Sequence, residues 1–247
     1  MRNLLLSALL CSLGCAATES ESDSGIGDGD PTNNGNGGDD DAGEDGSLTA
    51  TLMLLNAMSG AGVAGVTVES PTGESGTSGS DGSVGFTIDS GGTFEFRVRG
   101  DGVLDHLVFG PTGTSDFVYP TFVATDSLLT SVNNSLGTVT ATGTGIVVVG
   151  IDYEDLSPAV GATASIGAMH DSPWVFGPMG ASYGDTIPSG GMGAVIFPNV
   201  PPGDTSVTIQ PPSGATCAAF PGGGQMPNSP VFMNHVTVVT FHCTRTR

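Results

Sequence analysis

Three carboxylates close together in the sequence have the side-chain chemistry of a calcium site. Asp152, Glu154 and Asp155 follow the apolar segment 145–151 within four residues. Calcium takes such carboxylates when backbone carbonyl oxygens complete its coordination shell. A solvated loop before Pro158 explains the same residues without a ligand, because acidic side chains mostly face water. We therefore expect the solvated loop and keep calcium as the alternative.

The histidines form no metal-binding pattern, and we expect neither a metal nor a cofactor. His235 and His242 flank the last apolar segment, and an odd separation puts them on opposite faces of a regular strand. A β-bulge would reverse that relation, but no third ligand is spaced nearby to complete a zinc site. His106 is expected to be an exposed cross-strand residue of a sheet.

Aromatic side chains gather in the segment 168–187. Trp174, the only tryptophan, lies here with Phe176 and Tyr183 between prolines and glycines. Aromatic residues on a loop above a rigid sheet can form a binding surface for a glycan, a peptide or another protein. The sequence Trp-Val-Phe is also typical of a strand, so the same residues can instead pack over an open end of a sheet as part of the core. Both interpretations are kept.

The sequence contains no local catalytic motif. Gly-x-Ser-x-Gly, His-Glu-x-x-His and the phosphate-binding P-loop are all absent. Serine, histidine and aspartate occur, but without a spacing that marks a catalytic triad. We expect a protein that is not an enzyme. An unrecognised hydrolase is kept as an alternative, because a triad is a spatial arrangement that sequence spacing need not reveal.

The first residues have the pattern of an export signal. One arginine precedes the apolar segment 4–13, and Ser-Leu-Gly-Cys15 follows. The segment resembles a bacterial lipoprotein signal, in which the cysteine thiol receives a diacylglycerol and becomes the new N-terminus. An ordinary secretory signal or a short membrane anchor is the alternative, although about ten apolar residues are too few to span a bilayer. Ala16 gives no inner-membrane retention signal, so we expect anchoring to the outer membrane, facing the periplasm or the cell surface.

Charge and composition limit the partners. The net charge is −20, there is no lysine, and the chain has five basic residues. Because phosphate binding needs clustered Arg and Lys, nucleic acid is not an expected partner. The expected partners are the membrane, through the N-terminal lipid, and a cell-envelope protein or glycan. The acidic segment 16–46 has almost no apolar residues, so it is predicted to be a disordered linker.

Two cysteines remain once Cys11 and Cys15 are assigned to the N-terminal segment. Cys217 and Cys243 form an even pair in a chain that carries an export signal, and such a pair predicts a disulfide. It would close a loop of about 27 residues, which the chain-entropy estimate values at roughly 3–4 kcal/mol. Two buried free thiols are the alternative.

Glycine and proline are frequent along the whole chain, so short strands are expected in place of long helices. There are 40 glycines and 16 prolines. A weak internal duplication places strands over 49–56, 63–68, 84–88 and 93–98, and again over 145–151, 159–166, 192–197 and 205–209. Alternating apolar and polar residues in 93–99 indicate a strand with one buried face. A helix is predicted over 125–136, with Thr125 or Asp126 as its N-cap and Gly137 as its C-cap.

The motifs at these turns allow a family resemblance to be stated. Gly62-Val-Ala-Gly-Val-Thr-Val68 followed by Ser80-Asp-Gly-Ser-Val-Gly-Phe86 resembles the carboxypeptidase regulatory-like domain, a transthyretin-like β-sandwich. Val160-Gly-Ala-Thr-Ala-Ser-Ile166 and Phe197-Pro-Asn-Val-Pro-Pro-Gly203 are similar to the same family in the second copy. The resemblance covers most of 48–110 and 144–243. It implies a fold and an accessory, non-catalytic role, because turn and core residues specify no chemistry.

The sequence therefore predicts an all-β protein with two tandem antiparallel transthyretin-like or Ig-like β-sandwiches. The expected division is a signal peptide over 1–15, a linker over 16–46, a first sandwich over 47–123, a linker with a short helix over 124–143, and a second sandwich over 144–247. The expected function is that of a non-catalytic cell-envelope lipoprotein that serves as a binding or structural module.

Overall fold

The computed structural model describes residues 46–246. The predicted signal peptide with Cys15, and all of the predicted linker except Gly46, lie outside this range, so they stay predictions. Within residues 46–246, no helix is both long enough and apolar enough to cross a bilayer.

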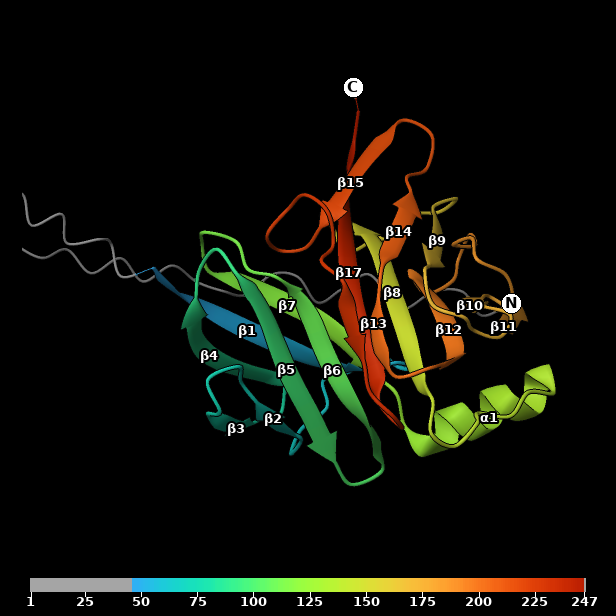
Figure 1. The fold of residues 1–247 in the computed structure, drawn as a ribbon, viewed down its shortest axis with the longest axis horizontal. Helices are drawn as coiled ribbons and strands as arrows, with labels where there is room; N and C mark the ends of the chain where they lie inside the picture. Colours follow the sequence, from blue (N-terminus) through green and yellow to red (C-terminus); the bar gives the residue numbers. More distant parts are fainter. Residues whose placement is uncertain (1–45, 247) are drawn as a thin grey trace, which may run out of the picture. The chain divides into compact units, whose positions relative to one another are not determined.

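Short strands dominate the described chain, as its glycine and proline content predicts (Figure 1). The strands of the first half are β1 (Ser47–Asn56), β2 (Thr67–Glu69), β3 (Ser75–Thr77), β4 (Ser83–Asp89), β5 (Thr93–Gly100), β6 (Val103–Pro111) and β7 (Phe117–Val123). A helix follows, α1 (Asp126–Leu136). The strands of the second half are β8 (Gly145–Tyr153), β9 (Thr163–Ile166), β10 (Trp174–Gly177), β11 (Gly180–Tyr183), β12 (Ala194–Val200), β13 (Gly203–Thr205), β14 (Val207–Gln210), β15 (Ala215–Ala219), β16 (Ser229–Val231) and β17 (Val236–Arg245). The all-β fold class is confirmed.

Strand β5 shows how the alternation of residue types sets the orientation of a strand. Phe94, Phe96 and Val98 are buried, while Arg97 and Arg99 between and after them are exposed. Successive side chains of a strand point to opposite faces, so one face joins the core and the other meets water. The predicted half-buried strand is confirmed.

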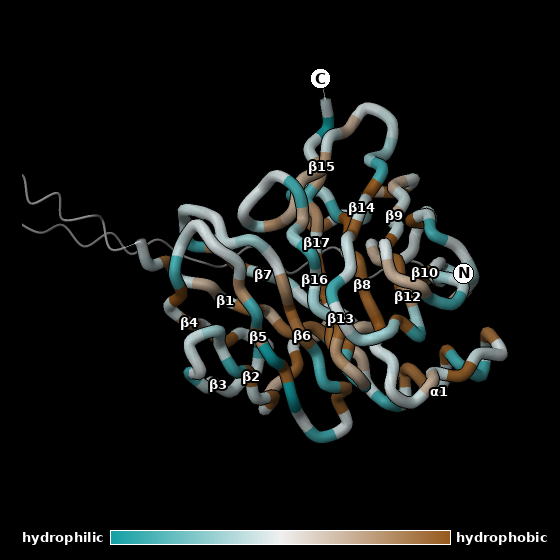
Figure 2. Tube along the Cα trace, in the orientation of Figure 1, coloured by the Kyte–Doolittle hydropathy of each residue, from teal (hydrophilic) through white to brown (hydrophobic). Residues whose placement is uncertain are grey.

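Helix α1 begins and ends at the residues that the sequence predicts. Thr125 is the N-cap, and its hydroxyl oxygen accepts a hydrogen bond from the backbone N–H of Leu128 at 3.2 Å. Gly137 ends the helix in the left-handed conformation, with φ of 67°, which glycine adopts without steric cost. In Figure 2, hydrophobic and hydrophilic residues alternate along α1, as expected for a helix with one buried face.

The strand pairing repeats between the two halves of the chain. In the first half β1 pairs with β4, β2 pairs with β5, and β1 pairs in parallel with β7. In the second half β8 pairs with β12, β9 pairs with β14, and β8 pairs in parallel with β17. The first two pairings in each half connect corresponding strands of the predicted duplication. The parallel pairing with β7 or β17 repeats as well, but these two strands were not part of the prediction.

One continuous sheet joins the two halves. Its strand order is β11-β10-β12-β8-β17-β6-β5-β2-β3, with β15 also pairing with β17, and we call it the shared sheet. The prediction of purely antiparallel sheets is wrong, because β17 runs parallel to both β6 and β8 and β7 runs parallel to β1. Parallel neighbours need long connections, and strands far apart in the sequence supply them here. The division into two independent sandwiches stays a prediction.

Two cores lie on opposite faces of the shared sheet. Along β6, Val108 belongs to the core of the first half and the next residue, Phe109, to the core of the second half. The first core is closed by the sheet β4-β1-β7. The second core is closed on the other face by β9, β14 and β16. Each half thus uses a different face of the sheet that they share.

Candidate functional site

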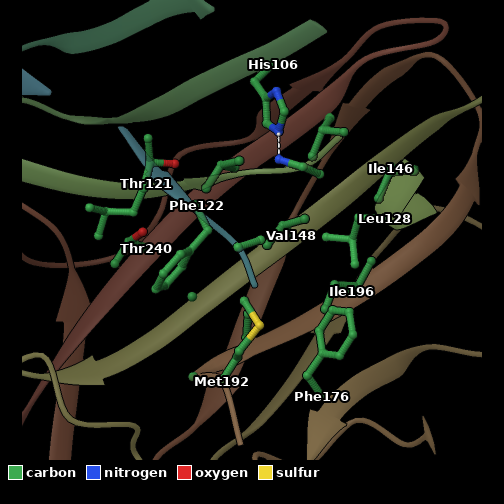
Figure 3. Close-up of a pocket in the computed structure, with 18 of the residues that line it drawn as sticks. His106, Thr121, Phe122, Leu128, Ile146, Val148, Phe176, Met192, Ile196 and Thr240 are labelled. Atoms are coloured by element: carbon green, nitrogen blue, oxygen red, sulfur yellow. Dashed lines mark hydrogen bonds between the residues drawn. The ribbon is translucent and has the colours of Figure 1, made fainter. Parts of the chain in front are cut away.

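A groove lies on the first face of the shared sheet, where the covering sheet β4-β1-β7 ends. Its volume is about 330 Å³. The register between β6 and β17 pairs Val108 with Val238, so the face that carries the first core continues across β17 and β8. Beyond β7, this face is covered only in part, by α1 and the β10–β11 hairpin. The groove is therefore the part of the shared sheet that neither half covers completely (Figure 3).

The floor of the groove consists of alternate residues of β8, β12 and β17. Strand β8 directs Val147, Val149 and Ile151 into the second core. The intervening residues line the groove, namely Ile146, Val148 and Gly150 on β8, Ala194 and Ile196 on β12, and Val236, Val238 and Thr240 on β17. Because both faces of β8 and β17 carry mainly apolar side chains, the floor is hydrophobic wherever it remains accessible.

One side of the groove is formed by α1 and the hairpin β10–β11. Leu128, Leu129 and Val132 lie on one helical face and line the groove. They belong to an apolar cluster with Trp174, whose indole meets the Phe176 ring edge-to-face at a centroid distance of 5.3 Å. The opposite side is formed by the end of β7, where Phe122 is exposed and lines the groove (Figure 3).

The prediction that His106 is an exposed residue is wrong, because it is 1% exposed and lies at the groove. Both nitrogens of its ring contact the backbone. Its Nε2 accepts a hydrogen bond from the N–H of Ala124 at 2.9 Å, and its Nδ1 contacts the carbonyl oxygen of Leu104 at 2.5 Å (Figure 3). These contacts assign the proton to Nδ1. Burial lowers the pKa of His106 to about 4, so the ring is neutral near pH 7 and ties β6 to the end of β7.

Two threonines lie along the groove. Thr240 lies against Gly150, where an added Cβ would come within 3.2 Å of the threonine oxygen. Thr121 is 2% exposed, and its side-chain oxygen is buried without a hydrogen-bond partner among the described residues. A buried hydroxyl without a partner is unfavourable, but a molecule in the groove does not reach this oxygen, because it has almost no accessible surface.

Asp152 supplies the carboxylate that lines the groove. It lies near the end of β8, six residues from Ile146, which corresponds to about 20 Å of extended strand. A side chain at Gly193 would collide with a carboxylate oxygen of Asp152, so glycine at this position makes room for the group. Burial raises the pKa of Asp152 to about 7. No ion pair or side-chain hydrogen bond joins this carboxylate to another described residue.

The other two predicted calcium ligands do not join Asp152. Glu154 is exposed and accepts a hydrogen bond from the Thr244 hydroxyl at 3.0 Å. Asp155 accepts hydrogen bonds from the backbone N–H and the hydroxyl of Ser157, which lower its pKa. Within residues 46–246, no group of three or more His, Cys, Asp or Glu side chains is placed to hold a metal ion. The three carboxylates are therefore close in sequence but separate in space.

The three predicted aromatic residues share one face of the β10–β11 hairpin, but they do not form an exposed surface together. Trp174 pairs directly with Tyr183 across the hairpin and is 7% exposed. Phe176 is half-buried and lines the groove. Tyr183 is 53% exposed, and its hydroxyl donates to the carbonyl oxygen of Leu136 at 3.0 Å, at the end of α1. The segment thus packs against α1, and ligand binding by these residues stays a prediction.

The predicted disulfide is confirmed. Cys217 and Cys243 are register partners on β15 and β17 and are joined by an S–S bond. His242, next to Cys243, stacks on Phe220 with a centroid distance of 3.8 Å. His235 lies 3.9 Å from a carboxylate oxygen of Asp105. Both histidines thus pack against other side chains, although the Nε2 of His242 is buried without a hydrogen-bond partner among the described residues.

Sequence reasoning missed the groove, although a signal for it was present. From Gly145 to Ile151 the sequence contains only glycine and apolar residues. An unbroken apolar run is typical of a strand that is covered on both faces. Such a run indicates that a second layer covers the sheet. Helix α1 supplies only part of that layer, and the groove is the part of the face that stays uncovered.

Comparisons with known proteins give no family assignment. No family model matches the chain, and no curated protein matches it, so membership in the carboxypeptidase regulatory-like family stays a prediction. Among solved structures, the minor pilin of Streptococcus agalactiae has 12% sequence identity and a TM-score of 0.28, with 81% of this chain and 97% of that chain covered. The major pilin of Streptococcus pyogenes has 12% identity and a TM-score of 0.27, with 82% and 99% covered.

A carbohydrate-binding domain from Eubacterium rectale, solved with maltoheptaose, has a similarly low likeness. Its sequence identity is 11% and its TM-score is 0.26, with 81% of this chain and 97% of that chain covered. TM-scores this low carry no argument about function, so a proposal about function has to rest on the groove itself.

Proposed function

We propose that this chain is a non-catalytic binding module that holds a ligand with an apolar body in the groove. The observation that carries the proposal is the accessible hydrophobic floor on β8, β12 and β17, in a groove of about 330 Å³. Small-molecule sites typically have about this volume, a mostly apolar lining and a few fixed polar groups. Here those polar groups are the Asp152 carboxylate and the hydroxyl of Thr240.

The polar groups of the groove support binding better than catalysis. His106 cannot act as a base on a ligand, because both of its ring nitrogens contact the backbone. General acid–base catalysis needs a titratable group within hydrogen-bond reach of the reacting atom. Asp152 is such a group, but no described nucleophile is hydrogen-bonded to its carboxylate. A nucleophile activated by a neighbouring base is the usual arrangement in hydrolases, and the groove residues Thr121 and Thr240 have no such base hydrogen-bonded to them. A binding role is therefore preferred to that of a hydrolase.

Trp174 provides a direct test of binding. It is the only tryptophan of the chain, and it lines the groove. We expect 1-decanol, an uncharged molecule with an apolar chain, to change the intrinsic tryptophan fluorescence in a saturable manner. Val148→Phe should weaken this binding by about tenfold, because the larger side chain fills the floor where Val148 is half-exposed.

Val118→Phe is the matched control for this experiment. Val118 is an exposed residue of β7 that does not line the groove, so the same substitution there should leave binding unchanged. A fluorescence response that saturates equally in both variants would contradict the groove as the binding site. Binding of soluble glycans without any response to decanol would favour the glycan-binding alternative.

The second part of the proposal concerns the N-terminus. We propose that Cys15 carries a lipid that anchors the module to the outer membrane, with 16–46 as a linker. The support is the charged start, the apolar segment 4–13 and the small residues before Cys15. Mass spectrometry of the mature protein should find a diacylated cysteine as its first residue. A mature N-terminus with an unmodified residue would contradict lipid anchoring.

A further inference from the structure

The carboxylate of Asp152 is the charged group that lines the groove, and no basic side chain within residues 46–246 forms an ion pair with it. The chain contains no lysine and five arginines, of which Arg2 and Arg247 lie outside the described residues. Arg97 pairs with Glu95 at 2.8 Å. Arg245 lies over the ring of Tyr153, at 3.8 Å from the centroid. No described arginine forms a salt bridge with Asp152.

The surroundings of Asp152 make an unpaired negative charge unfavourable. The backbone of Asp152 pairs with His242 on β17, and burial lowers the pKa of His242, which keeps that ring neutral near pH 7. On its other side the carboxylate lies against Gly193, which has no side chain to donate a hydrogen bond. Partial burial of a carboxylate without a partner costs free energy, and a cation in the groove would remove that cost.

Charge complementarity therefore limits the ligands that fit this groove. An anionic ligand would place a second negative charge beside Asp152, in a protein of net charge −20. A neutral apolar ligand would remove water from the carboxylate without replacing the lost hydrogen bonds. A ligand with a protonated amine would form a charge-assisted hydrogen bond with the carboxylate, while its apolar part covers the floor between Ile146 and Gly150.

We propose that the occupant of the groove is a cationic amphiphile, a small molecule with one protonated amine at Asp152 and an apolar body along β8 towards α1. This inference rests on the proposed function, because it names the ligand class of the same groove.

Three probes with the same apolar chain and different head groups distinguish the contribution of the head group to binding from that of the chain. Decylammonium, 1-decanol and decanoate are titrated into the full chain at about pH 8, below their micellar concentrations, with Trp174 fluorescence as the readout. At this pH both the amine and the Asp152 carboxyl are charged. We expect decylammonium to bind at least about tenfold more tightly than decanol, which is the value of one charge-assisted hydrogen bond. Decanoate should bind more weakly than decanol.

Asp152→Asn tests the carboxylate directly. This variant should lose the preference for decylammonium, with about tenfold weaker binding of the amine and no loss for decanol. Asp155→Asn is the matched control, because Asp155 lies three residues away, is exposed and does not line the groove. It should keep the full preference.

Each outcome separates this inference from the proposed function. If decanol binds while decylammonium has no advantage, or if Asp152→Asn keeps the advantage, the cationic ligand class is wrong and the apolar groove stands. If decanoate binds most tightly, the ligand class is also wrong. If none of the three probes binds, the proposed function itself is overturned.

Discussion

Removal of the disulfide between Cys217 and Cys243 should lower the free energy of unfolding by about 3 to 4 kcal/mol. The two cysteines are 26 residues apart in the sequence, and closing a loop of that size restricts the unfolded chain by about this amount. The bond joins β15 to β17, the central strand of the shared sheet. Urea unfolding of the Cys217→Ala/Cys243→Ala variant, compared with the unchanged protein, measures the loss.

Chemical reduction provides the control for this variant. Cys243 is buried in the second core, so its replacement also removes packing contacts. A reductant breaks the bond without changing the side-chain volume, and the difference between the two losses isolates the packing contribution. The double variant itself should not respond to the reductant. A reduced protein as stable as the oxidised protein would show that β15 is held to β17 by its hydrogen bonds alone.

Local patterns in the sequence were sufficient to predict local structure. Thr125 and Gly137 limit α1 as expected, and the alternation in β5 gives its buried face. The disulfide followed from the count of cysteines in a chain with an export signal. In each case the physical cause lies within a few residues or in a simple pairing rule, so a single sequence carries enough information.

The arrangement of the strands required information that the sequence does not carry locally. The duplication predicted which segments correspond, and β1 and β8 indeed pair with corresponding strands. It did not predict that β17, at the end of the chain, would enter between β6 and β8 and join the halves into one sheet. That position depends on contacts between residues that are 130 positions apart for β17 and β6 and 90 positions apart for β17 and β8, which no local pattern reports.

The candidate site illustrates the same difference. Adjacency in sequence suggested that Asp152, Glu154 and Asp155 act together, but Asp152 is still on β8 and lines the groove. Asp155 belongs to the following turn, where Ser157 binds its carboxylate. A strand places successive side chains on opposite faces and a turn redirects the chain, so neighbours in sequence point to different environments. Only the three-dimensional structure shows that Asp152 lines the same groove as α1 and β7.

Asp152→Asn should raise the free energy of unfolding above pH 7 and leave it unchanged near pH 4. Burial raises the pKa of Asp152 from 3.8 to about 7 in the folded protein, so the folded state binds this proton more tightly than the unfolded state. Below about pH 4 the carboxyl is protonated in both states and costs nothing. As the pH rises towards 7, the unfolded state ionises first and the folded protein loses stability.

The size of this effect follows from the pKa difference. At 1.36 kcal/mol per pH unit, the interval from 3.8 to about 7 corresponds to about 4 kcal/mol as an upper value. Asparagine keeps part of the burial cost of a polar group, so the expected gain is about 2 to 4 kcal/mol at pH 8. His242 on the neighbouring strand does not reverse this gain, because burial lowers its pKa and it is neutral at pH 8. Urea unfolding at several pH values between 4 and 8 measures the gain.

Asp155→Asn distinguishes this mechanism from a general effect of removing negative charge from an acidic protein. The hydrogen bonds from Ser157 lower the pKa of Asp155, so its ionised form favours the folded state and its loss should be slightly destabilising at pH 8. If Asp152→Asn raises the free energy of unfolding and Asp155→Asn lowers it, the gain is due to the burial of Asp152. If both variants gain stability equally, the cause is the net charge of −20. If the gain of Asp152→Asn does not depend on pH, the carboxylate is solvated, and the reason for expecting a cation in the groove is lost.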